Sequence, residues 1–439
     1  MEVLGSTLQD IPKLICHLYN ELKPVLDTGF YFLIKYSIMN KGGIMLPFTR
    51  MVKYGNKVIP YVPNFTKLVT PAVGYSFTCT MLLDVNGSVW AMGLQNGGIF
   101  GLGNTTQVTE WTKIYSNVKD FWCSTGNGFC LIRTNDDRFF YSGLDKWLGN
   151  NTTNTVTTFT ECTSYFTQFG ISKIKEIYVG LDYALILGTD NSLYLLGDNK
   201  NSKFGLNTAS YFNKFTFLVD NVKKFCSSIT PSNWIIKLDN TIWRTGTTSH
   251  GTLGNGVQNT YIFPWVQYKG TPVTEAIDVF CSASYIGIIT KGTPESCPMF
   301  TMGYQADGQL GNNTTAGGYK LTPTLSKTVP DDSEFIRIEN ISSRGLVYYS
   351  SGKIYSTGYN NNGQLANNST INSGSFVEAI LPDGVNFKKS ESLVAGNDAT
   401  LYMYINNKLY YAGKSPDNIS ASSSSVMKEF PLPTINAST

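Results

Sequence analysis

A strand-ending glycine recurs seven times along this chain, and the repeat around it constrains the fold more than any other feature of the sequence. The residue three places before each glycine is always aromatic, and the residue four places before it is always apolar. The seven glycines are Gly93, Gly143, Gly197, Gly246, Gly303, Gly358 and Gly413. They recur with a period of about 53 residues, which indicates stacked copies of one supersecondary unit.

Each copy predicts four short β-strands. A lead strand, such as residues 111–114, comes first and is followed by a second strand, such as Val118–Cys123. A third, apolar strand (residues 183–187 in one copy) leads through a tight turn with Asn or Gly to the aromatic strand that ends at the glycine. Four such strands form one sheet, which buries both of its faces only by packing against neighbouring sheets. The sequence therefore predicts an all-β, seven-bladed β-propeller.

Six of the seven copies carry a four-residue hook after the aromatic strand, which ends in Gly or, once, in Ala. The polar turn before it uses residues that tolerate a positive φ. The third residue of each hook is apolar, and we predict that it packs between neighbouring blades. These residues are Phe100, Leu148, Phe204, Leu253, Leu310 and Leu365.

The C-terminal end suggests how the ring closes. The seventh copy lacks the hook, and residues 430–433 (Phe-Pro-Leu-Pro) resemble an eighth lead strand. An eighth lead strand for seven copies predicts that a strand near residues 429–435 completes a blade begun elsewhere, which leaves no open sheet edge between the chain ends. The propeller is therefore predicted to span residues 61–439.

Residues 1–60 do not follow the repeat and are predicted to form a separate helix-plus-hairpin segment. Apolar residues between positions 11 and 26 fall on one helical face, and two strand-like runs, 30–39 and 44–48, flank a Gly-Gly pair. Two interpretations stay open. The segment packs on the propeller as a cap, or it is a docking segment for a partner protein or a symmetry mate.

The strand-ending glycine, the Gly-Gln-Leu-Gly hook at residues 308–311 and the period resemble the regulator-of-chromosome-condensation repeat family. The resemblance covers residues 61 to about 435 and implies a seven-bladed β-propeller. Where the family usually has Trp before the glycine, this chain has Met92, Ser142, Leu196, Thr245, Met302, Thr357 and Ala412. The family's founding member is an exchange factor for a nuclear small GTPase, but a shared fold does not by itself transfer a function.

The sequence offers few residues in patterns that support catalysis or metal binding. Of the two histidines, His17 and His250, the second lies in a hook turn and is predicted to be an exposed loop residue. No zinc-ligand spacing and no phosphate-binding loop occurs, and the eight cysteines form no C-x-x-C pair. Asp307 is replaced by Asn362 in the next copy, which favours a turn residue over a metal ligand. We therefore predict no enzyme activity and no catalytic, cofactor-binding or metal-binding residues; the residues of a binding site stay unknown.

Charge and the distribution of apolar residues argue against nucleic acid and membrane as partners. Charged residues make up 15% of the chain, against roughly 25% in an average globular protein. The net charge of +3 without a long basic run argues against nucleic-acid binding. The most apolar window, residues 30–38, is far shorter than the about 20 residues that a membrane-spanning helix needs, and no signal peptide is visible at the N-terminus.

Three functions from different classes remain. The first choice is a structural or attachment component of a virion, of phage tail or fibre type, located in the virion. Its N-terminal segment would contact virion neighbours, and its loops would bind a host-surface glycan or protein. The alternatives are an intracellular regulator of a small GTPase, like the family's founding member, and a secreted protein-binding propeller; if the protein is not in a virion, the expected location is the cytoplasm. The oligomeric state would be set by the assembly.

Overall fold

The computed structural model describes residues 34–39, 45–50, 62–71, 79–124, 128–149, 152–200, 203–208, 210–227, 232–248, 250–273, 275–330, 334–336, 344–350, 352–388, 391–417 and 422–434. The chain divides into two compact units, Val62–Pro433 and Met1–Tyr61 with Thr434–Thr439. In the smaller unit β1 (Ile34–Met39) pairs antiparallel with β2 (Met45–Arg50), which confirms the predicted hairpin. The predicted helix between positions 11 and 26 lies outside the described residues, and the docking role of residues 1–60 stays a prediction.

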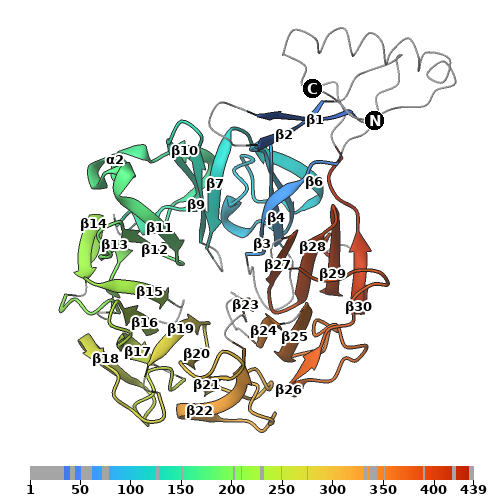
Figure 1. The fold of residues 1–439 in the computed structure, drawn as a ribbon. Helices are drawn as coiled ribbons and strands as arrows, with labels where there is room; N and C mark the ends of the chain where they lie inside the picture. Colours follow the sequence, from blue (N-terminus) through green and yellow to red (C-terminus); the bar gives the residue numbers. More distant parts are fainter. Residues whose placement is uncertain are drawn as a thin grey trace, which may run out of the picture. The chain divides into compact units, whose positions relative to one another are not determined.

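Seven four-stranded antiparallel sheets arranged in a ring make up the larger unit, as predicted (Figure 1). Each blade consists of four consecutive strands, with the first strand innermost and the fourth at the rim. The first blade contains β3 (Phe65–Val69), β4 (Cys79–Asp84), β5 (Val89–Gly93) and β6 (Val108–Tyr115). The second blade contains β7 (Val118–Cys123), β8 (Phe129–Thr134), β9 (Phe139–Leu144) and β10 (Thr155–Glu161). The third blade contains β11 (Ile174–Val179), β12 (Tyr183–Gly188), β13 (Leu193–Asp198) and β14 (Tyr211–Val219). The fourth and fifth contain β15 (Val222–Ser227), β16 (Ser232–Lys237), β17 (Ile242–Thr248) and β18 (Thr260–Gln267); and β19 (Ala276–Cys281), β20 (Tyr285–Thr290), β21 (Cys297–Tyr304) and β22 (Tyr319–Val329). The last two contain β23 (Glu334–Ile336), β24 (Gly345–Ser350), β25 (Lys353–Gly358) and β26 (Ser373–Glu378); and β27 (Ser392–Gly396), β28 (Thr400–Ile405), β29 (Lys408–Lys414) and β30 (Ser423–Phe430).

The grouping of strands into blades differs from the prediction by one strand. The sequence interpretation placed each lead strand at the start of its own sheet, whereas the structure pairs it with the preceding aromatic strand. The predicted lead strand at residues 111–114 is part of β6, which pairs with β5 and not with β7. The reason is local: after the hook the chain reverses and returns antiparallel beside the strand it has just left.

Ring closure also differs from the prediction. β30 ends at Phe430 and pairs with β29 in its own sheet, and residues 431–434 form no strand. Among the residues described between 429 and 434, none therefore completes a blade begun elsewhere. The first and seventh blades meet through side chains instead. The Phe65 amide donates a hydrogen bond to Tyr404 Oη at 3.2 Å, and Trp111 Nε1 donates one to the Pro431 carbonyl at 2.8 Å. Since each blade is complete from its own strands, the ring closes without a sheet that is shared between the two ends of the propeller.

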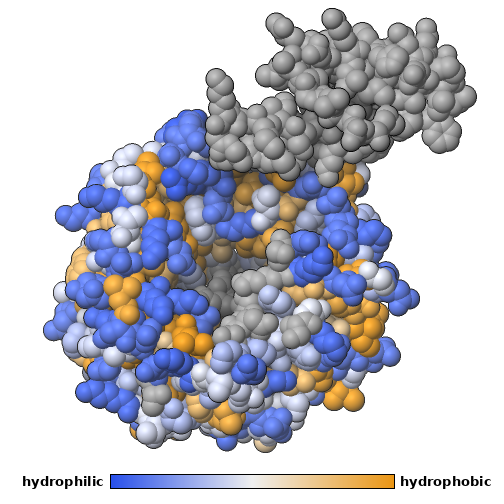
Figure 2. All heavy atoms as spheres, in the orientation of Figure 1, coloured by the Kyte–Doolittle hydropathy of each residue, from blue (hydrophilic) through white to orange (hydrophobic). Residues whose placement is uncertain are grey.

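The core consists of the layers between adjacent blades. The second strands β4, β12, β20 and β28 are buried at every residue, because both faces of each sheet are covered by neighbouring blades. This explains why apolar residues occupy most positions of these strands instead of alternating with polar ones. On the face drawn in Figure 2, hydrophobic residues reach the surface as separate patches among hydrophilic ones.

The connections between blades differ in length, and the one between the second and third blades contains the helix α2 (Thr163–Phe169). Phe166 of this helix is fully buried and stacks on Phe139 with 3.8 Å between ring centroids. In the part of the chain that the structure describes, no helix has the length and apolar character needed to cross a membrane.

Candidate functional site

Two kinds of loop meet on one face of the propeller, which we name the hook face. Because the four strands of a blade are antiparallel, the hook and the loop between the first and second strands lie at the same end of the sheet. The opposite face, the turn face, carries the turns between the second and third strands and the connections between blades. A site on the hook face can therefore combine residues from loops of several blades.

Each hook packs on the outer strand of the next blade. A Cβ on Gly308 would lie 2.7 Å from the Gly374 Cα in β26, and a Cβ on Gly363 would lie 2.6 Å from the Ser425 Cα in β30, so only glycine fits. Just after the hook, the Asn313 amide donates to the Gly374 carbonyl at 2.8 Å. The six apolar hook residues are between 0% and 7% exposed, which confirms that they pack between blades.

A buried polar side chain two residues after the repeat glycine organises the hooks, and the sequence interpretation missed it. Asn360 Nδ2 donates to the carbonyls of Ser369 and Ile371 at 2.9 and 3.0 Å, and its Oδ1 accepts from the Leu365 amide at 2.9 Å. The same position is held by Gln95, Asp145, Asn199 and Gln305, all buried. The remaining copies have Thr248 and Ser415 at this position. All seven copies therefore have a polar residue there, and an alignment of the copies would have revealed it.

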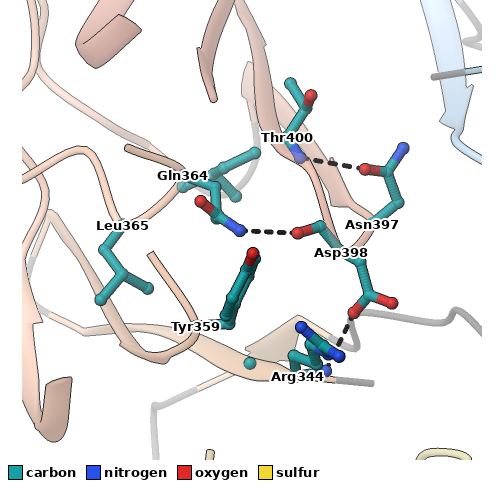
Figure 3. A pocket seen from close by; sticks show the side chains of 9 residues that line it. Arg344, Tyr359, Gln364, Leu365, Asn397, Asp398 and Thr400 are labelled. Carbon is teal, nitrogen blue, oxygen red and sulfur yellow. Dashed lines mark hydrogen bonds between the residues drawn. The ribbon is translucent and has the colours of Figure 1, made fainter. Parts of the chain in front are cut away.

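A group of charged and aromatic side chains lies on the hook face where the fifth, sixth and seventh blades meet (Figure 3). We name it the Arg344 cluster; it comprises Asp307, Arg344, Tyr359, Gln364 and Asp398. Asp307 precedes the fifth hook, Arg344 precedes β24, Tyr359 follows β25, and Asp398 lies between β27 and β28. Figure 3 shows Arg344 beside Tyr359, with Gln364 pointing toward Asp398.

The backbone of this cluster is held from both sides. The Arg344 amide donates to Asp398 Oδ1 at 3.0 Å, and the carbonyl of the next residue, Gly345, accepts from Tyr285 Oη at 2.6 Å (Figure 3 draws the first of these). Gln364 Nε2 donates to the Asp398 carbonyl at 2.6 Å. Bonds to the fifth and seventh blades therefore fix where the Arg344 side chain starts, as a preorganised binding site requires.

The Arg344 side chain is partly exposed, with 33% of its surface accessible to solvent. Its guanidinium lies 4.7 Å from the Tyr359 ring centroid, and its Nε lies 3.6 Å from Asp307 Oδ2. Burial raises the pKa of Asp307 above its ordinary value, although Arg344 opposes the shift. A carboxyl whose pKa is raised on folding stabilises the fold at low pH and loses that contribution as the pH rises through its folded pKa. The charge on Asp307 at neutral pH is thus a cost to stability, and Asn362 fills the equivalent position without it.

A second charged group on the hook face is closed on itself. Lys146 and Lys203, from the second and third hooks, both contact Asp182 and Asp198, with N–O distances of 2.9 to 3.9 Å. Burial raises the pKa of Asp182, but its ion pair with Lys203 and its hydrogen bonds outweigh burial, so the pKa lies below its ordinary value. Two cations and two carboxylates satisfy one another here, which indicates a contact that joins blades.

Of the two histidines considered for catalysis, His17 lies outside the described residues. His250 is half-buried, not exposed as predicted, and its ring lies 6.2 Å from that of Tyr304 and 5.8 Å from that of Tyr319. Burial lowers the pKa of His250. Among the described residues, no three His, Cys, Asp or Glu side chains are grouped so that they could hold a metal ion. The arrangement of the hook face suits contacts with another molecule.

No protein-family model matches the sequence. Among solved structures, the chain is similar to human WBSCR16, with 15% identity and a TM-score of 0.56 over 80% of this chain and 87% of that one. It is similar to Prp20p of Saccharomyces cerevisiae, studied for its binding to Gsp1p and histones, with 13% identity and a TM-score of 0.55 over 74% and 80% of the two chains. It is also similar to yeast RCC1 (Prp20) bound to Kap60, with 12% identity and a TM-score of 0.58 over 87% and 89%.

These comparisons confirm the predicted resemblance at the level of the fold, which is the propeller of the regulator-of-chromosome-condensation type. They do not support the first-ranked functional hypothesis. None of the three is described as a virion or phage tail component, and two are described with protein partners. The virion location and the host-surface glycan receptor likewise find no support in these structures.

Proposed function

We propose that this propeller is a non-enzymatic binding protein that docks a globular protein partner on its hook face through the Arg344 cluster. The observation that carries the proposal is an Arg stacked on a Tyr, on a preorganised loop end, next to a carboxylate whose charge reduces stability. Arg and Tyr are enriched among the residues that dominate binding energy at protein interfaces. Groups that cost stability without serving the fold are typical of functional sites.

The Arg344→Ala variant should lose its partner, while a control on the turn face should keep it. Lys408, at the start of β29, pairs with Glu429 at 2.8 Å, and both side chains are about half exposed. We expect quantitative affinity capture from the source cells to show at least one protein depleted about tenfold by Arg344→Ala and by Tyr359→Ala, but not by Lys408→Ala. Asp307→Asn should reduce capture of the same protein and still unfold at a higher temperature than the wild type.

An identical set of captured proteins for wild type, Arg344→Ala and Tyr359→Ala would contradict docking at this cluster. A lower melting temperature for Asp307→Asn would show that the carboxylate stabilises the fold, and it would contradict the claim that the charge of Asp307 reduces stability. The two readouts are independent, because capture measures the interface and melting measures the scaffold.

A second candidate function is nucleotide exchange on a small GTPase, favoured by the structural likeness to yeast Prp20p. We expect the purified chain to accelerate release of fluorescent GDP from at least one small GTPase of its source cells, and Arg344→Ala to slow that release. The matched control is again Lys408→Ala. If no GTPase of the panel releases GDP faster, exchange activity is excluded, whereas docking of another protein on the hook face is tested separately by capture.

A further inference from the structure

A groove of about 500 Å³ lies beside α2 on the turn face, between the second and third blades. Its floor is aromatic: the Phe169 ring of α2 lies 4.8 Å from that of Tyr194 and 5.6 Å from that of Phe215. Phe217 continues this surface along β14, with its ring 6.0 Å from that of Tyr194 and 51% of its surface exposed. We name this the α2 groove; Figure 1 shows α2 near β13 and β14 at the rim of the ring.

Two exposed lysines, Lys173 and Lys214, line the α2 groove. Within the part of the chain that the structure describes, neither forms an ion pair with a carboxylate. The carboxylate that lines the groove, Asp190, accepts hydrogen bonds from Tyr194 Oη at 2.8 Å and from the Ser192 amide at 3.0 Å. The groove therefore presents two unneutralised positive charges above an aromatic floor.

The pairing of β14 explains how a lysine and a phenylalanine that are adjacent in sequence both reach the groove. In a regular strand, Lys214 and Phe215 would point to opposite faces. The register between β13 and β14 shifts between Leu195 and Gly197, so that the β14 partners run from Thr216 to Phe212. Such a bulge re-aims side chains, and here it places a cation beside the aromatic floor.

A second groove at the corresponding place between the sixth and seventh blades has a different character. It measures about 570 Å³ and is lined by aliphatic side chains that include Ile380 and Val385. Its lysine, Lys353, pairs with Glu378 at 2.9 Å, so its charge is neutralised within the chain. The free lysines of the α2 groove are thus not a general consequence of the propeller geometry.

We propose that the α2 groove binds a short acidic segment of a partner protein. An aromatic or apolar side chain of the segment packs on Phe169, Tyr194 and Phe215, and flanking carboxylates pair with Lys173 and Lys214. A small anionic molecule could fill the groove but would leave Phe217 uncovered, whereas an extended peptide covers both. β14 is the last strand of its sheet, and no described strand pairs with its outer edge, so an extended segment also finds backbone groups there.

The probe that tests this site is an array of short synthetic peptides, each with one Phe, Tyr or Trp between Asp or Glu residues, against a matched array with Lys in place of the acids. We expect the full chain to bind the acidic array selectively. For the best peptide, Lys173→Glu with Lys214→Glu should weaken binding about tenfold, and Phe217→Ala should also weaken it. The control, Lys113→Glu with Lys269→Glu, changes the net charge equally at exposed positions away from the groove and should leave the affinity unchanged.

Selective binding that survives Lys173→Glu with Lys214→Glu, in a protein with an unchanged melting temperature, would overturn the proposal. Equal binding to both arrays would overturn it as well. Phenylacetate, a small aromatic carboxylate, serves as competitor: if it binds as tightly as the best peptide, the groove is a small-molecule site. Failure here leaves the Arg344 cluster untouched, because the two sites lie on opposite faces of the propeller.

Discussion

Leu310→Asp should lower the free energy of unfolding by on the order of 5 kcal/mol. Leu310 is fully buried in a cluster with Tyr285 of the fifth blade and Leu346 of the sixth. Removing its side chain leaves a cavity between the blades, and the introduced carboxylate would be surrounded by the apolar side chains of this cluster instead of water. Urea denaturation of the purified chain, followed by circular dichroism, measures the change.

The control for this substitution is Leu325→Asp. Leu325 lies on β22 of the same blade and is 54% exposed, so we expect its replacement to change the free energy of unfolding by less than about 0.5 kcal/mol. Equal midpoints for the two variants would show that the fifth hook does not hold two blades together. A large loss for Leu310→Asp alone would establish the apolar hook residue as the contact that joins one blade to the next.

The sequence predicts the elements of this fold well because the repeat is local. The predicted strand Val118–Cys123 coincides with β7, and every repeat glycine falls within the C-terminal part of its strand. The burial of the apolar hook residues was also predicted correctly. A single apolar side chain in an otherwise polar loop is removed from water most readily by packing against the neighbouring blade. Seven copies turn a weak pattern into a strong one.

The assignment of strands to blades depends on information that the repeat does not contain. When strands recur at a fixed period, a lead strand could belong to the sheet before it or to the sheet after it. Its pattern of apolar and polar residues is compatible with both. The structure decides for the preceding neighbour, since β6 pairs with β5. The predicted closing strand was wrong for the same reason: shifting every blade by one strand leaves an apparent strand too many at the C-terminus.

The Arg344 cluster could be predicted only in part. Asp307 attracted notice in the sequence and was interpreted as a replaceable turn residue. Its partner Arg344 lies in the next copy, and Asp398, which orients the Arg344 amide, lies a further 54 residues along the chain. Residues from three blades come together here only because the blades are arranged in a ring. An alignment of the repeats compares equivalent positions in different copies and does not show which residues of neighbouring blades are in contact.

Gly358→Ala should lower the free energy of unfolding by on the order of 4 kcal/mol, because it combines backbone strain with a collision. Gly358 has a φ of 112°, and a Cβ would collide with the Arg344 carbonyl and lie 2.7 Å from the Gly345 Cα. Both atoms belong to the backbone that carries the Arg344 cluster, so the collision cannot be relieved by moving a flexible side chain. We therefore expect partner capture on the hook face to fall together with stability.

Gly318→Ala separates the two causes, since Gly318 has the same φ of 112° but no atom within 4 Å of the place that an added Cβ would take. It should cost only the strain of the backbone conformation, about 1 to 2 kcal/mol, measured by the same denaturation experiment. A loss at Gly358 no larger than that at Gly318 would mean that the strand-ending glycine is required for its φ alone. A larger loss shows that the repeat glycine also allows the close approach of the second and third strands, and this approach recurs at Gly143, Gly197, Gly303 and Gly413. The repeat glycine would then be required because the third strand passes close to the end of the loop between the first and second strands, on the hook face of the same blade.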